Sequence, residues 1–173
     1  DVYKRQTHNK ENRNKGVFLM ISGDFSGIQK FIYHIRSEGA MRMLRGRSFY
    51  LDIALENIVD ELLNALHLSR ANLIYCSGGH FYILADNTKE TQDAVKDVAK
   101  KINQGLVKLF SGTLYLAIGC EPLCANDLMA ESDTVHHKKN IFRSVSEKVS
   151  MAKLSRYGPD ILTELFDENS NVN

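Results

Sequence analysis

The chain has 173 residues, of which 43% are hydrophobic and 25% are charged, and these proportions are typical of one soluble globular domain. Its formal net charge of +1 argues against a strongly basic nucleic-acid-binding protein, because binding to a phosphate backbone usually requires a clear positive excess. The three cysteines fit reduced thiols better than a disulfide framework, so we expect a cytoplasmic protein. No apolar run reaches the roughly 18 residues that suggest a membrane span, and we expect no membrane contact.

The two ends of the chain differ in composition from its middle. Residues 1–6, DVYKRQ, lack an initiator methionine and look like a translated sequencing adapter, and a polar run continues to residue 15. The last residues, LFDENSNVN, are also polar. We therefore expect a scar and linker without regular structure at 1–15, a folded domain at 16–158, and a tail at 159–173 that leads toward a further region of a longer protein.

The first half of the folded region predicts a strand and two helices. GVFLMI, residues 16–21, is a continuous apolar run of strand length. Ser26 and Gln29 have the spacing of a capping box, and the apolar residues that follow recur with helical spacing, which predicts a helix from about 27 to 39. A leucine-rich stripe predicts a second, longer helix from about 48 to 68.

The second half predicts a hairpin, a helix, a strand and a last helix. In NLIYCSGGHFYILAD, residues 72–86, two apolar runs flank a Gly-Gly pair, which is typical of a tight β-hairpin. The remaining elements are a helix with the capping pair Asn87 and Glu90, a strand at 114–120 that ends at Glu121-Pro122, and a helix at about 141–157.

This order of elements predicts an α+β fold. It corresponds to the ferredoxin-like βαββαβ pattern, with an extra helix before the hairpin and another helix at the C-terminal end. Palm domains of polymerases and of GGDEF-type nucleotidyl cyclases have this pattern. In such a sheet the end of the first strand lies beside the turn of the hairpin, so Asp24 and the Gly78-Gly79 turn should meet.

The meeting point of Asp24 and the turn is where palm enzymes hold two divalent ions. Two metals that bridge the attacking and leaving oxygens of a phosphoryl transfer need at least two carboxylates. Here the hairpin carries SGGH and has no acid before Asp86, and an imidazole such as that of His80 is a poor ligand for Mg²⁺. We therefore expect no catalytic residue and no metal site, and Asp24 is the one candidate for a metal ligand.

Three segments, GDFSGIQKFIY, RMLRGRSFYLDIALENI and NLIYCSGGHFYIL, are similar to the first GGDEF-like palm domain of the Csm-type large subunit of type III CRISPR interference complexes. The resemblance covers about residues 16 to 157. It implies a parent protein with an HD nuclease domain, a zinc region and a second, acidic palm, in which the paired palms make cyclic oligoadenylates from ATP when target RNA is bound. It also implies partnership with other Csm-type subunits and crRNA, and Mg²⁺ or Mn²⁺ held by the second palm.

The resemblance implies that this chain is a degenerate palm, that is, a palm without the catalytic acids, and that it holds a nucleotide opposite the second, catalytic palm. Lys153 lies in MAKLSRYG, which is similar to the segment of GGDEF cyclases whose lysine faces nucleotide phosphate. Structural alternatives stay open, because glycines also form ordinary hairpin turns, and Asp24 or Lys153 could simply stabilise helix ends. The role of His80 is open. The nucleotide-binding residues implied are Asp24, Ser26, Ser77, Gly78, Gly79, His80 and Lys153.

Arg42, Arg45 and Arg47 directly precede the predicted long helix. The positive end of a helix dipole is an unfavourable place for cations unless an anion or an acidic partner is present. The three arginines therefore predict contact with a phosphate, an RNA backbone or an acidic partner surface. The alternative is a solvated loop that packs against a neighbouring domain or an intramolecular acid.

Two other functions are compatible with the sequence alone. A stand-alone nucleotidyl cyclase or polymerase palm would share the fold, although the hairpin without carboxylates argues against it. A small RNA-binding module of ferredoxin-like fold could stack bases on Tyr75 and Tyr82. The two successive helices and the near-neutral charge argue against this second alternative.

Overall fold

The computed structural model describes residues 13–33, 39–128, 140–156 and 158. These residues form a four-stranded antiparallel sheet with the strand order β2-β3-β1-β4, which confirms the predicted α+β fold. The strands are β1 (Phe18–Ser26), β2 (Leu73–Ser77), β3 (His80–Asp86) and β4 (Tyr115–Leu123). The helices are α2 (Ile28–Tyr33), α3 (Ala40–Ala65), the 3₁₀ helix η2 (Arg70–Asn72), α4 (Lys89–Phe110), α5 (Ala125–Leu128) and α6 (Ile141–Leu154).

The main core lies between one face of the sheet and the helices α3 and α4. Leu19 and Ile21 of β1 and Phe81 of β3 point to this face and are at most 1% exposed. They belong to the same cluster as the leucine stripe of α3, of which Leu55 and Leu62 are fully buried. Burying one such side chain contributes roughly 1.5–3 kcal/mol, so this layer supplies most of the apolar stabilisation.

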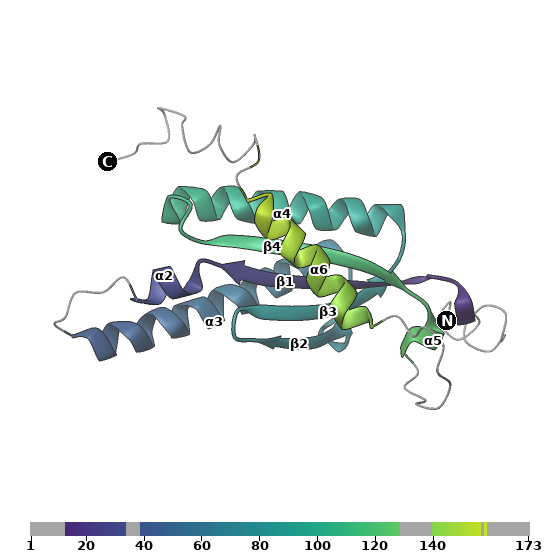
Figure 1. Cartoon of the computed structure of the whole chain (residues 1–173), viewed down its shortest axis with the longest axis horizontal. Helices are drawn as coiled ribbons and strands as arrows, with labels where there is room; N and C mark the ends of the chain where they lie inside the picture. Colours follow the sequence, from purple (N-terminus) through teal and green to yellow (C-terminus); the bar gives the residue numbers. More distant parts are fainter. Residues whose placement is uncertain (1–12, 34–38, 129–139, 157, 159–173) are drawn as a thin grey trace.

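Helix α6 crosses the opposite face of the sheet (Figure 1). Its residues Val145 and Val149 are at most 2% exposed, and Val145 belongs to a second apolar cluster with Met20 of β1. At Gly119 of β4 the helix lies so close that a Cβ atom would be 2.7 Å from the backbone nitrogen of Val149. Glycine therefore permits the tight contact between α6 and the sheet.

Helix α3 begins at Ala40, well before the predicted start at residue 48. Gly39 precedes the helix in a left-handed conformation with a φ of 74°, and Gly46 lies inside the helix with open space around it. The prediction of a loop at this Arg-Gly-Arg run was wrong, because the neighbouring Arg, Leu and Met residues are good helix formers and tolerate one glycine. The three arginines thus lie within the first turns of α3 rather than before it.

The strands β1 and β4 extend beyond their predicted ends. β1 continues to Ser26 instead of residue 21, because the SGDFS segment keeps its pairing with β4. β4 continues to Leu123 instead of residue 120 and includes Pro122. A proline is tolerated there because β4 is an edge strand, and a proline lacks the N–H that a central strand would need.

The hairpin of β2 and β3 is confirmed, whereas several helix boundaries differ from the prediction. Helix α2 covers the start of the predicted first helix, and residues 34–38 lie outside the described part of the chain. Helix α4 is capped by Thr88, whose hydroxyl accepts a hydrogen bond from the backbone N–H of Thr91. The predicted cap was Asn87, with Glu90 as its partner, so the observed N-cap, Thr88, lies one residue later than predicted. Helix α6 ends slightly before its predicted end, and the sequence pattern does not predict α5.

The predicted linker and tail fall mostly outside the described residues. Residues 1–12 and 159–173 are not described, so the expectations for them stay expectations. Among the helices that are described, none is long and apolar enough to cross a membrane.

Candidate functional site

The Gly78-Gly79 turn lies directly beside the end of β1, as predicted. Asp24 is opposite the first residue of β3, and the backbone N–H of Phe25 donates to the carbonyl of Gly79 at 2.9 Å. Both glycines have a positive φ, of 63° and 85°, which suits a two-residue type I′ turn. At Gly79 a Cβ atom would lie 2.3 Å from the side chain of Ile28, whereas at Gly78 nothing lies within 4 Å. The backbone of Gly78 is therefore open to approach.

Asp24 is paired with cationic groups of the chain itself. Its carboxylate oxygen Oδ2 forms an ion pair with Nζ of Lys153 in the last turn of α6. Nδ1 of His80 lies 3.7 Å from the same oxygen. The side chains of Asp24 and Lys153 are 25% and 36% exposed, so the pair remains accessible from solvent. Asp24 thus has a direct partner in α6, besides its position shortly before α2.

His80 points toward the face of the sheet that α6 crosses. Its Nε2 atom lies 3.3 Å from the hydroxyl of Ser22, which is fully buried. Its ring meets the ring of Tyr82 edge-on, with centroids 4.9 Å apart. Sequence reasoning missed Ser22, although its spacing of two residues from Asp24 puts both side chains on one face of β1 and could have indicated it.

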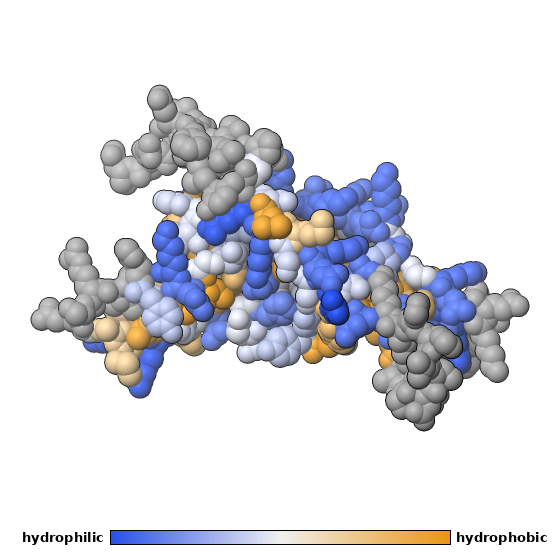
Figure 2. Space-filling model, viewed as in Figure 1, coloured by the Kyte–Doolittle hydropathy of each residue, from blue (hydrophilic) through white to orange (hydrophobic). Residues whose placement is uncertain are grey.

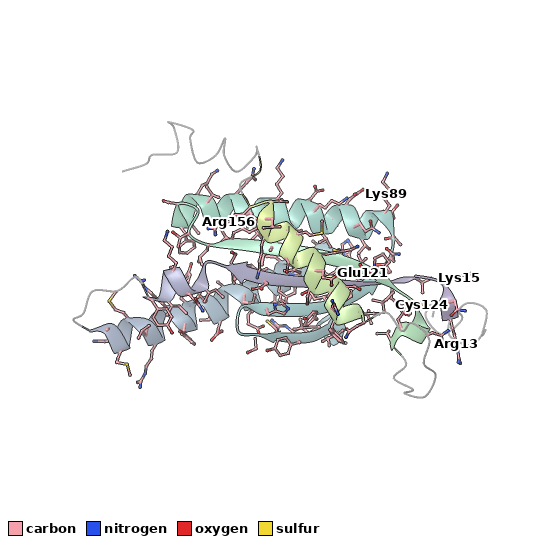
Figure 3. The ribbon with its side chains drawn as sticks, in the orientation of Figure 1. Arg13, Lys15, Lys89, Glu121, Cys124 and Arg156 are labelled. Carbon is pink, nitrogen blue, oxygen red and sulfur yellow. The ribbon has the colours of Figure 1, made fainter. Side chains whose placement is uncertain are left out.

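The described residues do not fit a divalent metal. No group of three His, Cys, Asp or Glu side chains among them could hold a metal ion. Another carboxylate on the α6 face, Glu121, is 4% exposed and pairs with Lys148 at 2.8 Å, beneath α6 (Figure 3). Asp24 alone, placed between an ammonium and an imidazole, is a poor donor set for Mg²⁺, which prefers several oxygen ligands.

The two predicted serines lie at the same end of the sheet. Ser77 ends β2 opposite His80, and its side chain is exposed. Ser26 ends β1 opposite Tyr115 and is half-buried. Strand alternation directs both serines to the α6 face, the face that carries Asp24. The structure therefore brings the predicted nucleotide-binding residues of the strands, the turn and α6 together in one region.

The three arginines are not part of this region, because they lie on α3, which packs against the other face of the sheet. Arg42 and Arg45 are exposed. Arg47 donates from Nη1 to the backbone carbonyl of Phe31 at 2.5 Å. The guanidinium carbon of Arg47 also lies 5.3 Å from the centroid of the phenyl ring of Phe31. Arg47 therefore links α3 to α2 within the chain.

Arg156, just after α6, is a residue that the sequence reasoning did not single out. Its Nη2 atom donates to the carbonyl of Gly112 in the turn before β4, and Figure 3 shows it at the upper end of α6. This contact ties the end of α6, which carries Lys153, to the β4 side of the domain. A basic residue three positions after Lys153 in MAKLSRYG was the signal available in the sequence.

The cysteines add no reactive group to the site. Burial raises the pKa of the Cys76 and Cys120 thiols from 9.0 to about 11. Burial also raises the pKa of Cys124. Since the thiolate is the nucleophilic form, burial favours the neutral, less nucleophilic form of all three side chains near pH 7.

The fold and the site define a class of protein, a palm-type α+β domain whose hairpin lacks the acids of a catalytic palm. Solved structures of the same fold agree with this assignment. A Csm1-Csm4 cassette in complex with one ATP is 35% identical, with a TM-score of 0.75, over 91% of this chain and 21% of that chain. A Csm1-Csm4 cassette in complex with cA4 is 36% identical, with a TM-score of 0.73, over 84% of this chain and 20% of that chain.

The family model for Csm1 subunit domain B matches residues 17–169. The Cas10/Csm1 protein of Mycobacterium tuberculosis, a CRISPR system single-strand-specific deoxyribonuclease of subtype III-A, is 43% identical in an alignment of 160 residues that covers 88% of this chain and 20% of that relative. The chain belongs to the Csm1 subunit domain B family, and the predicted resemblance is confirmed. It spans about a fifth of the length of the relatives that it matches.

Proposed function

We propose that this chain is the first, degenerate palm of the large subunit of a type III-A CRISPR effector, and that it binds ATP at the interface with a second, catalytic palm of the same protein. In this proposal the paired palms make cyclic oligoadenylates from ATP for antiviral defence in the cytoplasm. Other Csm-type subunits, crRNA and target RNA are its partners in the complex. Solved Csm1-Csm4 cassettes that hold ATP or cA4 support a nucleotide role for the domain.

The observation that carries the proposal is the arrangement of the turn, Asp24 and Lys153 at one end of the sheet. The backbone of Gly78 is unobstructed, so a phosphate or base can approach it closely. Ser77 is exposed beside it and offers a hydroxyl. The ammonium of Lys153, held by Asp24, can compensate phosphate charge. In this proposal the chain supplies position and charge compensation.

The bond-forming chemistry is assigned to the second palm. Phosphoryl transfer through two metals needs carboxylates that hold both ions, and the described residues beside the turn offer only Asp24, already paired with Lys153 and close to His80. Mg²⁺ or Mn²⁺ held by the second palm supplies the Lewis-acid chemistry when bound. The residues of this chain bind and orient the ATP that is the substrate.

The two alternative functions fit the contacts less well. A stand-alone cyclase needs a second carboxylate beside Asp24, whereas the acid of the hairpin, Asp86, lies opposite Phe18 at the other end of β1. An RNA-binding module needs an open aromatic platform on the sheet, and the rings of Tyr75 and Tyr82 do lie 6.3 Å apart. However, Phe142 of α6 packs on Tyr82 with ring centroids 5.3 Å apart, so α6 covers part of the surface on which bases would stack.

The proposal predicts that bulk beside the turn lowers cyclic oligoadenylate output. Ser77→Phe in the full-length subunit, assembled with target RNA, should reduce output on the order of tenfold, because small misplacements of a reactant cost large factors in rate. Gly79→Asp should also lower output. However, Gly79 has a φ of 85° and an added Cβ atom would clash with Ile28, so this variant is also expected to destabilise the fold. Ser77 is exposed, so its variant isolates the effect on the ligand.

The matched control is Asn64→Phe, which introduces the same side chain at an exposed position of α3. Output is measured as cyclic oligoadenylate formed from ATP, and target RNA binding is measured in parallel. We expect RNA binding to be unchanged in both variants and output to fall only in Ser77→Phe. Unaltered cyclic oligoadenylate output in Ser77→Phe, or an equal loss of output in both variants, would contradict the proposal.

A further inference from the structure

A group of large apolar side chains is exposed on α3 and α4. Phe49 and Ile53 of α3 are 66% and 52% exposed, and Leu109 of α4 is 73% exposed. Figure 2 shows apolar surface at the projecting end of α3, at lower left. Contiguous exposed apolar groups commonly mark interaction surfaces. The α3–α4 surface comprises Met41, Met43, Phe49, Tyr50, Ile53 and Leu109.

A groove of about 380 Å³ lies between α3 and α4 at this surface. The lining residues recur every three to four positions on each helix, so they form two ridges that face each other. The lined stretch runs over residues 50–58 of α3 and 102–110 of α4, a length of ~12 Å at the helical rise per residue, and a helix of about two turns fits along it. Residues that line the groove include Tyr50, Ile53, Asn57, Ile102, Gly105 and Leu109.

Two glycines inside these helices point to a closely approaching partner. A Cβ atom at Gly46 of α3 or at Gly105 of α4 would have nothing within 4 Å. Neither glycine is among the residues with positive φ. Glycine inside a helix is destabilising relative to alanine, and neither backbone conformation nor packing among the described residues requires it here. A partner whose backbone comes close to α3 and α4 would require both.

The charges on α3 specify the chemistry of that partner. Glu56 and Asp60 in the C-terminal half pair with Arg70, at 2.6 and 2.8 Å. Arg42 and Arg45 in the N-terminal half are exposed, and no described residue forms an ion pair with either. Cations near a helix N-terminus oppose the helix dipole, and the first turn of α3 has no acid to offset them. An acidic group on a partner would complement this end of the surface.

We propose that the α3–α4 surface is the docking site for an amphipathic helix from the rest of the same subunit. The apolar face of that helix fills the groove over Ile53 and Leu109 and approaches the backbone at Gly105. Its Asp or Glu side chains lie opposite Arg42 and Arg45. This chain makes up about a fifth of the length of its relatives, so the parent subunit has ample sequence to supply such a helix. The surface lies across the sheet from the proposed nucleotide site and does not depend on it.

The test is thiol labelling of cysteines introduced one at a time at the surface. Ile53→Cys and Leu109→Cys are made in this chain and in the full-length subunit, and maleimide labelling rates are compared in the absence of RNA. Labelling is quantified at each introduced cysteine by site-resolved mass spectrometry, so the native thiols of Cys76, Cys120 and Cys124 do not enter the comparison. Lys89→Cys, exposed at the start of α4 and outside the surface, is the matched control.

A docked helix protects the two probe positions in the subunit but not in the chain alone. We expect labelling in the subunit to be slower by at least about tenfold at both probes, because access then requires a local opening. Labelling at the control should change little. Equal rates in chain and subunit would overturn the proposal. Protection that arises only when RNA is added would assign the surface to nucleic acid, and protection in the chain alone that rises with concentration would assign it to a second copy.

A charge reversal separates docking from a purely structural role of the arginines. Arg42→Glu places an acid in the first turn of α3, which favours the helix dipole and should leave the melting temperature of the chain unchanged or higher. In the full-length subunit the same change opposes the acidic partner, so it should accelerate labelling of Ile53→Cys by a few-fold. If labelling in the subunit did not accelerate, the acidic character of the partner would be wrong.

Discussion

The two lysines of α6 that reach the sheet differ in the burial of their partners. The side chain of Glu121, paired with Lys148, is 5% exposed, whereas that of Asp24, paired with Lys153, is 25% exposed. Removing a cation withdraws charge compensation from its carboxylate, and the penalty is largest when that carboxylate is buried. Lys148→Met should therefore lower the free energy of unfolding by about 3 kcal/mol and Lys153→Met by about 1 kcal/mol. Urea unfolding of the chain measures both losses, and a larger loss for Lys153→Met would contradict this ranking.

The buried thiol of Cys120 predicts a loss of stability at high pH. Its folded-state pKa of about 11 lies above its ordinary value of 9.0 because burial disfavours the thiolate. The stabilising contribution of the neutral thiol is therefore complete below pH 9.0 and is lost as the pH rises through about 11. Between pH 8 and 10.5 this thiol should remove roughly 2 kcal/mol of unfolding free energy.

Cys120→Ala is the control for this prediction, because alanine does not titrate. Urea unfolding at both pH values should give a smaller loss with pH in the variant than in the native chain. An identical pH dependence in both would assign the loss to other groups.

At the level of single residues, the sequence identified the members of the candidate site better than their contacts. The order of elements was enough to place Asp24 beside the glycine turn, because strand ends and hairpin turns meet in this fold. The ion pair of Asp24 with Lys153 joins residues far apart in the sequence, and no local pattern specifies the crossing of α6 that creates it. The contact of His80 with Ser22, by contrast, joins neighbours on the paired strands β1 and β3 and follows from their register.

At the level of secondary-structure elements, two glycines in α3 and β4 should respond oppositely to alanine. Gly46 has open space around it inside α3, so Gly46→Ala should stabilise the isolated chain by roughly 0.5–1 kcal/mol through helix propensity. Gly119 touches the backbone of α6, where a Cβ atom would lie 2.7 Å from the nitrogen of Val149. Gly119→Ala should therefore destabilise the chain by about 1–3 kcal/mol through overpacking. Thermal unfolding of both variants measures the signs, and two changes of the same sign would contradict the packing described.

Element types were predictable from periodicity, whereas several boundaries were not. The leucine stripe identified α3, but it starts only at Leu51, so the prediction missed the first turns of the helix, which begins at Ala40. Pro122 was interpreted as the end of β4, although an edge strand accommodates it. In both cases the surrounding fold, rather than the local residue, decides where the element ends.

At the level of the whole molecule, the sheet separates two surfaces with different chemistry. The α6 face carries the turn glycines, Asp24, His80 and Lys153, which suit contact with a phosphorylated ligand. The opposite layer carries the exposed apolar groove of α3 and α4. In our two proposals, one side of the domain holds a ligand and the other side anchors the domain to the rest of a larger subunit.

The most direct test of the proposed function is whether ATP reaches the turn of this palm. A trifluoromethyl probe attached to Ser77→Cys in the full-length subunit reports its surroundings by fluorine NMR, and the same probe at Asn64→Cys on α3 is the control. We predict that saturating ATP shifts the resonance at position 77 and leaves that at position 64 unchanged. An unmoved resonance at position 77, while equilibrium dialysis detects ATP bound to the same subunit, would contradict the assignment of this palm to ATP binding.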